Sequence, residues 1–223
     1  MAQFVAVGIY SYVLGAFMNP MLEELSWARS DFSLTRSISQ IVMAFVGILI
    51  GAKVDQIGAR PIMLVGTTIL VVSLCAHTFV TSLWMWWALN GIVVTIGCAM
   101  VGNLVVNATL SKWFFEKRGR AVAIAAMGVS FGGIAITPPI TYLIDLLGWR
   151  LSWVLLGFSA GILLYPVAMM MRKAPEDFGL LPDGKKPNSE GSRSVDAAQS
   201  EFLNSYSRSE AIRTFSFYGL VLA

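Results

Sequence analysis

The residues with the clearest catalytic pattern are Gly128-Val129-Ser130-Phe131-Gly132, which match the G-x-S-x-G signature of serine hydrolases. His77, the single histidine, and Asp145 could complete a set in which the histidine takes the proton of the Ser130 hydroxyl. A hydrolase needs this signature at a strand–turn–helix junction, whereas here it lies inside an apolar run of helical length. Glycines four residues apart are also typical of close helix packing in membranes, and we favour that interpretation.

A second group of candidate residues lies in the turn Gly51–Pro61, with the letters G-A-K-V-D-Q-I-G-A-R-P, between two long apolar runs. Gly51 and Gly58 permit tight backbone conformations and close approach of helices. Asp55 is an acid at a membrane edge that is otherwise rich in Lys and Arg. A solvated helix end is the alternative interpretation of this turn.

The composition places these residues in a membrane. The chain has 223 residues, of which 56% are hydrophobic and only 13% charged, and its mean hydropathy is +0.69. A soluble domain has about 25% charged residues, and a globular core of this size cannot hide so much apolar surface. The net charge of +3 resides in particular loops, so it gives no indication of nucleic-acid binding.

Six apolar runs are long enough to cross a bilayer as helices, which takes about 20 residues each. Strands of a membrane barrel would be about 9–11 residues long with alternating polarity, so we expect an all-α protein. The predicted spans are Ala2–Leu22, Ser37–Val54, Pro61–Val80, Trp84–Leu110, Ala121–Leu143 and Leu151–Met171.

The positions of Lys and Arg predict the orientation of the spans. Most of the 16 basic residues follow the second, fourth and sixth spans, whereas Arg29, Arg36 and Arg150 lie on the other side. The positive-inside rule puts the first set in the cytoplasm. We therefore expect a multi-pass protein of the plasma (inner) membrane with a cytoplasmic N-terminus and central loop.

The chain divides into three parts by composition. Residues 1–173 form the six-helix bundle, residues 174–211 form a polar cytoplasmic loop, and residues 212–223 begin a seventh helix. Because that last apolar run is too short to cross, we expect this chain to be the first half of a larger protein.

The charged turn resembles the loop between the second and third helices of the major facilitator superfamily of secondary transporters. Three further signatures match a branch similar to monocarboxylate porters and oxalate–formate antiporters. They are Lys112–Ala121, Gly148-Trp149-Arg150 and Pro175–Gly184.

The resemblance implies a six-helix N-terminal bundle, built from two three-helix repeats, that rocks against a C-terminal bundle absent from this chain. It implies secondary active transport of a small organic solute, with a carboxylate anion as the leading expectation and a coupling proton or counter-substrate. It implies neither enzymatic activity nor a cofactor or metal. A non-transporting six-helix membrane protein is the main alternative, and a hydrolase using Ser130 is another.

The resemblance also assigns roles to residues. Gly51, Asp55, Gly58 and Arg60 would form the gating loop that locks and releases the cytoplasmic side, although Gln56 and Ala59 stand where the family often has basic residues. Polar residues near mid-membrane are expected to line the substrate cavity, with interhelical hydrogen bonds as the alternative role. They are Tyr10, Tyr12, Asn19, Asn103 and Ser130.

The spans contain almost no charge, which bears on the carboxylate expectation. An anionic substrate needs a positive partner, and intramembrane ionisable residues are usually functional. We expect that partner to be an intramembrane Arg or Lys of the missing half.

Overall fold

A computed structural model describes residues 1–173 and residue 183. These residues form helices and short connections, with no strand among them. The all-α class predicted from run length is therefore confirmed for this part of the chain. The predicted loop over 174–211, apart from residue 183, and the seventh helix over 212–223 lie outside the described residues.

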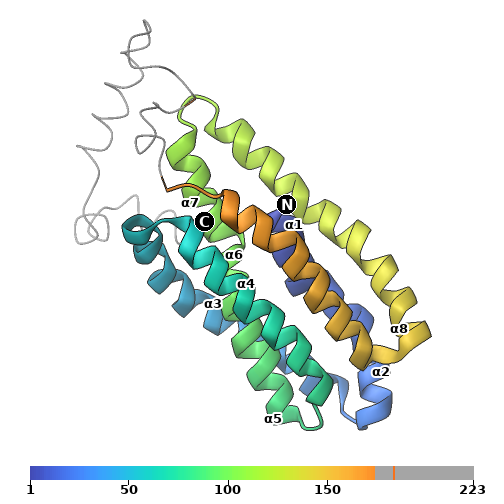
Figure 1. Cartoon of the computed structure of the whole chain (residues 1–223). Coiled ribbons are helices and arrows are strands. Elements are labelled where there is room, and N and C mark those ends of the chain that lie inside the picture. The colour runs from blue at the N-terminus through green and yellow to red at the C-terminus, as the bar shows by residue number, and fades with distance from the viewer. Residues whose placement is uncertain (174–182, 184–223) are drawn as a thin grey trace, which may run out of the picture.

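The helices follow one another in long rods joined by tight turns (Figure 1). The first rod is continuous from Ala2 to Leu25, and the fourth runs from Leu83 to Trp113. The elements are α1 (Ala2–Val7), η1 (Gly8–Val13), α2 (Leu14–Leu25), α3 (Arg29–Ile57), α4 (Ala59–Ala76), η2 (His77–Phe79), α5 (Leu83–Trp86), η3 (Trp87–Val94), α6 (Thr95–Val101), α7 (Asn103–Trp113) and α8 (Arg118–Met170).

Five of these rods are long and apolar enough to cross a membrane. The predicted fifth and sixth spans are joined in α8, which is 53 residues long. Gly148 has non-helical dihedral angles inside α8, with φ 79° and ψ 161°. The chain reverses there, so α8 has an outgoing arm over 118–147 and a returning arm over 149–170 (Figure 1).

The first and fourth rods share a departure from α-helical geometry. Each contains a π-helical segment, η1 over Gly8–Val13 and η3 over Trp87–Val94. Segments of this kind are rare and occur frequently at functional sites. Two predicted cavity residues, Tyr10 and Tyr12, lie in η1.

The outgoing arm of α8 packs directly on the first rod. A Cβ added to Gly132 would lie 2.5 Å from the Phe4 carbonyl oxygen, and one added to Gly8 would lie 3.6 Å from the Gly132 backbone. The backbones touch because neither residue has a side chain. The predicted packing role of the G-x-S-x-G glycines is therefore observed at Gly132.

An aromatic cluster packs at the end of the bundle farther from the charged turn. Phe17 stacks on Trp153 with ring centroids 3.9 Å apart, and Phe32 stacks on Trp86 at 4.6 Å. His77 lies between these pairs and is fully buried, with its ring centroid 4.5 Å from that of Trp153. This cluster joins the first, second, fourth and last helical stretches.

The rods are covered to different extents. In its most apolar window, α3 has only 17% of its residues buried, whereas the rod from Leu83 to Trp113 has 61% buried. The fourth rod therefore lies inside the bundle, and α3 lies at its edge with large apolar side chains such as Phe45 exposed.

The contact at Gly132 predicts a stability effect. Gly132→Ala should lower the free energy of unfolding by about 1–3 kcal/mol, because the methyl group meets backbone rather than a movable side chain. Gly15→Ala is the matched control, since a Cβ there meets nothing within 4 Å. Thermal unfolding of the full-length protein in detergent measures both, and equal melting temperatures for the two variants would contradict the close contact.

Candidate functional site

The predicted charged turn connects α3 to α4. Helix α3 ends at Ile57, and Gly58 follows with φ 85° and ψ 171°, a region that is essentially restricted to glycine. The Gly58 N–H donates to the Val54 carbonyl at 3.1 Å and closes the last turn of α3. Helix α4 then begins at Ala59, so Gly58 alone connects the two helices and its dihedral angles set the direction in which α4 leaves α3.

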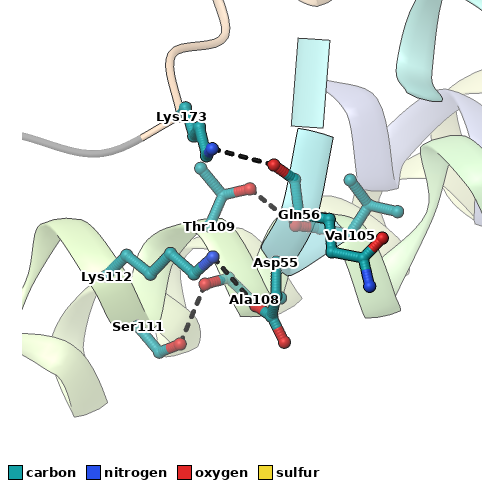
Figure 2. A network of polar contacts seen from close by, with 8 residues as sticks. All are labelled: Asp55, Gln56, Val105, Ala108, Thr109, Ser111, Lys112 and Lys173. Atoms are coloured by element: carbon teal, nitrogen blue, oxygen red, sulfur yellow. Dashed lines mark hydrogen bonds and ion pairs between the residues drawn. The ribbon is translucent and has the colours of Figure 1, made fainter. Parts of the chain in front are cut away.

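Asp55 makes an ion pair across the bundle. Its carboxylate oxygen lies 2.8 Å from the Lys112 ammonium nitrogen, in the last turn of α7 (Figure 2). An acid near the C-terminus of a helix opposes the helix dipole, and Lys112 offsets that cost. The Asp55 side chain is 69% exposed, and such pairs contribute about 0–1 kcal/mol. The pair is therefore weak enough to form and break.

Lys173, just beyond the end of α8, reaches the same helix end. Its ammonium group donates to the Gln56 carbonyl at 2.8 Å, which satisfies a carbonyl in the last turn of α3 (Figure 2). Its side-chain carbons lie 3.1 Å from where a Cβ of Gly58 would be. Asp55, Lys112, Lys173 and the Gln56 carbonyl, which we name the basic-end network, thus tie the ends of α3, α7 and α8 together.

The other residues of the predicted gating loop make fewer contacts. Arg60 is exposed and has no ion pair or hydrogen bond within the described part of the chain, whereas Asp55 is paired with Lys112. A Cβ on Gly51 would meet nothing within 4 Å, and one on Gly58 would meet the Lys173 side chain.

A carboxylate from beyond α8 caps the start of α8. Asp183 accepts hydrogen bonds from the backbone N–H groups of Phe115, Glu116 and Lys117 at 3.2, 2.8 and 3.4 Å. These groups lead into the N-terminus of α8, where a negative charge is favoured. Asp183 belongs to the fourth sequence signature and the three donors to the second, so the structure brings these two signatures together.

The opposite end of the bundle has its own tie. Glu24, near the end of α2, accepts hydrogen bonds from the Trp149 indole and the Arg150 guanidinium. The Arg150 guanidinium carbon also lies 4.2 Å from the centroid of a Trp149 ring. The third signature, Gly148-Trp149-Arg150, therefore joins the turn of α8 to the first rod.

A sequence model of the Major Facilitator Superfamily matches residues 1–223, which is the whole chain. The chain belongs to the Major Facilitator Superfamily. With several helices long and apolar enough to cross a bilayer, it is a multi-pass membrane protein.

Relatives in this superfamily carry transporter names. The chain is 26% identical over 162 residues to monocarboxylate transporter 11 of Mus musculus, covering 70% of this chain and 36% of that protein. It is 29% identical over 187 residues to the MFS transporter asaE of Aspergillus flavus, covering 82% and 39%. It is 25% identical over 159 residues to the uncharacterized MFS-type transporter YcxA of Bacillus subtilis, covering 71% and 39%. The chain thus spans less than two fifths of these relatives' length.

No hydrogen bond among the described residues joins the predicted cavity residues of this superfamily member to one another. Tyr12 packs against Gly133, where an added Cβ would lie 2.9 Å from its ring, and is 42% exposed. Asn19, Asn103 and Ser130 are also exposed. Tyr10 is half-buried, and its ring and carbonyl both contact Arg36.

Arg36 lies further into a helix than the apolar run suggests. The apolar run begins at Ser37, which suggests that Arg36 lies outside the second span. The structure begins α3 at Arg29, so Arg36 is seven residues inside that helix. Its guanidinium donates to the Tyr10 carbonyl of the first rod at 3.0 Å. The Ser- and Asp-containing start of the helix, Arg29–Asp31, is the signal that could have extended the span.

A second missed contact joins α1 to α7. The Gln3 amide donates to the Asn107 amide oxygen at 3.0 Å, and Gln3 is buried. Polar side chains in membranes commonly make such interhelical bonds. Gln3 stands in the first turn of the first apolar run, where a polar residue gives only a weak signal.

The hydrolase arrangement is not formed. Both ring nitrogens of His77 have partners other than Ser130, since Nδ1 lies 2.7 Å from the Ser73 carbonyl oxygen and Nε2 lies 3.4 Å from the Asn90 amide nitrogen. Ser130 is exposed inside α8 rather than at a strand–helix turn. Within the described part of the chain, Ser130 therefore has no contact with His77.

The dihedral angles of Gly58 predict a local effect on the turn. Gly58→Ala should lower the free energy of unfolding by about 1–3 kcal/mol, because a methyl group is strained at that φ and ψ and also meets Lys173. Gly51→Ala, in the helix interior, should be neutral or stabilising by up to about 1 kcal/mol. Thermal unfolding in detergent compares them, and an unaffected Gly58→Ala variant would contradict the observed turn.

The Asp183 cap predicts a local effect at the start of α8. Asp183→Ala should speed hydrogen exchange of the 115–117 amides by roughly 2- to 30-fold, because a side-chain cap contributes about 0.5–2 kcal/mol. Asp183→Asn is the control, since it keeps an acceptor oxygen and should show a smaller change. Exchange measured by mass spectrometry reports both, and equal rates in wild type and Asp183→Ala would refute the cap.

Proposed function

We propose that this chain is the first bundle of a secondary active transporter that moves a small organic solute by alternating access. The observation that carries the proposal is the basic-end network, in which exposed groups tie the ends of three helices. The Asp55–Lys112 pair is exposed and weak, so a small free-energy change breaks it and releases α3 from α7. All three helices belong to this bundle, so breaking the pair frees the end of α3 within it, and we propose that this local change accompanies rocking against the second bundle.

Six crossings fit this proposal better than five. Helix α8 is 53 residues long, which is about 80 Å at about 1.5 Å per residue. The hydrocarbon core is about 30 Å thick, so each arm on either side of Gly148 has the length for one crossing. The bundle then has an even number of crossings, so its two ends lie on the same side of the membrane. We propose that the membrane is the plasma membrane and that the N-terminus and the segment after α8 lie in the cytoplasm.

The solute cavity in our proposal lies between this bundle and a C-terminal bundle. Tyr12, Asn19, Asn103 and Ser130 are exposed polar residues on apolar helices, and a second bundle would cover them. Burying them against lipid alone would leave their polar groups unsatisfied. We propose that a coupling proton or a counter-substrate uses the same cavity. We propose no enzymatic step for this protein.

A carboxylate anion is the proposed solute. Three of the signatures resemble the monocarboxylate porter branch, and the relatives include monocarboxylate transporters 11 of Mus musculus and 7 of Homo sapiens. These names describe the relatives, which are 26% and 25% identical to this chain. They support a carboxylate as the solute of this protein.

The gating role of the ion pair is testable by charge removal and charge exchange. Asp55→Asn and Lys112→Gln should each change the rate of pyruvate uptake into proteoliposomes by roughly 2- to 5-fold, since an exposed pair is worth up to about 1 kcal/mol. The double variant Asp55→Lys with Lys112→Asp should restore part of the rate. Melting temperatures should stay close to wild type.

Lys53→Gln is the matched control, because Lys53 is exposed in the same turn and has no partner among residues 1–173 and 183. A readout that needs no substrate is maleimide labelling of Asn103→Cys, which should speed up when the pair is broken. Unchanged labelling and uptake in both single variants would refute the gating role, whatever the solute is.

A further inference from the structure

Arg36 carries a positive charge with no counter-charge in the described part of the chain. Its Nη1 donates to the Tyr10 carbonyl at 3.0 Å, and its guanidinium carbon lies 4.3 Å from the Tyr10 ring centroid. The ion pairs Lys112–Asp55 and Arg150–Glu24 involve other groups. A guanidinium has five N–H donors, so most donors of Arg36 are left for something else.

The Arg36 guanidinium lies against the middle part of the first rod. Tyr10 is eight residues beyond Ala2, so its carbonyl, to which Arg36 donates, is about 12 Å along a rod of about 36 Å. An ionised side chain at such depth is costly unless an anion or water-filled cavity accompanies it, and it usually marks a substrate pathway.

Tyr10 holds the guanidinium in a fixed orientation. The Tyr10 ring lies against one face of the Arg36 guanidinium, and the Tyr10 carbonyl accepts one of its N–H groups. The other edge of the guanidinium has no partner among the described residues. Arg36 is only partly buried, so that edge is not sealed inside the bundle. The Tyr10 hydroxyl is buried and also lacks a hydrogen-bond partner among the described residues. The π-helical geometry of η1 at this point is a second sign of a functional position.

We propose that Arg36, held on Tyr10, is the positive partner that binds the carboxylate group of the transported anion. The proposal rests on the function proposed above and moves the expected cation from the second bundle into this one. A guanidinium suits a carboxylate because its planar fork makes two parallel hydrogen bonds. An ammonium group at the same place is a point charge and does not reproduce that geometry.

The test measures carboxylate binding to the complete transporter. The purified protein is placed in phosphatidylcholine vesicles, which have no net charge, so that no anionic lipid occupies Arg36. Formate, lactate, pyruvate and oxalate are titrated, and the rise in melting temperature gives the concentration of half-maximal effect. Lactamide, a neutral analogue of lactate, should have no effect.

We expect at least one carboxylate to stabilise the wild type and Arg36→Gln to need at least about tenfold more of it, because a charge-assisted pair is lost. Arg36→Lys should fall between the two. Arg29→Gln, which removes the same charge from the exposed start of α3, should match the wild type. If Arg36→Gln does not fold, the carboxylate dependence of Arg36→Lys is compared with that of its control, Arg29→Lys. The proposal then requires a weaker response in Arg36→Lys than in Arg29→Lys.

The failures are distinguishable. Equal carboxylate dependence in wild type and both Arg36 variants overturns the role of Arg36 and leaves the carboxylate proposal standing. A variant that loses melting temperature without ligand but keeps its carboxylate dependence shows a structural role and overturns the inference too. No response of the wild type to any of the four carboxylates overturns both the inference and the carboxylate proposal, and leaves the gating proposal to its own labelling test.

Discussion

The bundle depends on helices that touch backbone to backbone, because lipid gives apolar helices no hydrophobic reason to associate. At Gly132 a helix of α8 meets the Phe4 carbonyl with no side chain between them. A comparable contact joins α4 to α6, where a Cβ on Gly97 would lie 3.0 Å from the Leu70 backbone nitrogen. These contacts fix the rods, and the polar ties at the helix ends then act on rods whose positions are already set.

The polar groups divide the bundle into a breakable part and a permanent part. The aromatic cluster around the buried His77 is closely stacked and has no exposed charge. The basic-end network consists of long, exposed side chains with weak individual energies. The opposite end also has an exposed ion pair, Glu24–Arg150, but there it lies beside the stacked aromatic cluster. We therefore expect motion at the basic-end network, while packing of the aromatic rings holds the shape of the other end.

Much of the fold was readable from the sequence because apolar run length alone predicts helices in a bilayer. The charged turn and the packing role of Gly132 were also readable, since both depend on local spacing. The partner of Asp55 was not, because nothing in the sequence says which lysine lies across the bundle. The contact of Arg36 with Tyr10 was not readable either, because the helix begins two turns before the apolar run, at Arg29, and its packing on the first rod is not encoded locally.

Gly148 has a consequence for how the protein is made. A single residue with φ 79° turns the chain between two apolar arms, and no polar loop separates them. Once both arms have been synthesised, so short a connection keeps them side by side, and they pack as a helical hairpin without a search for one another.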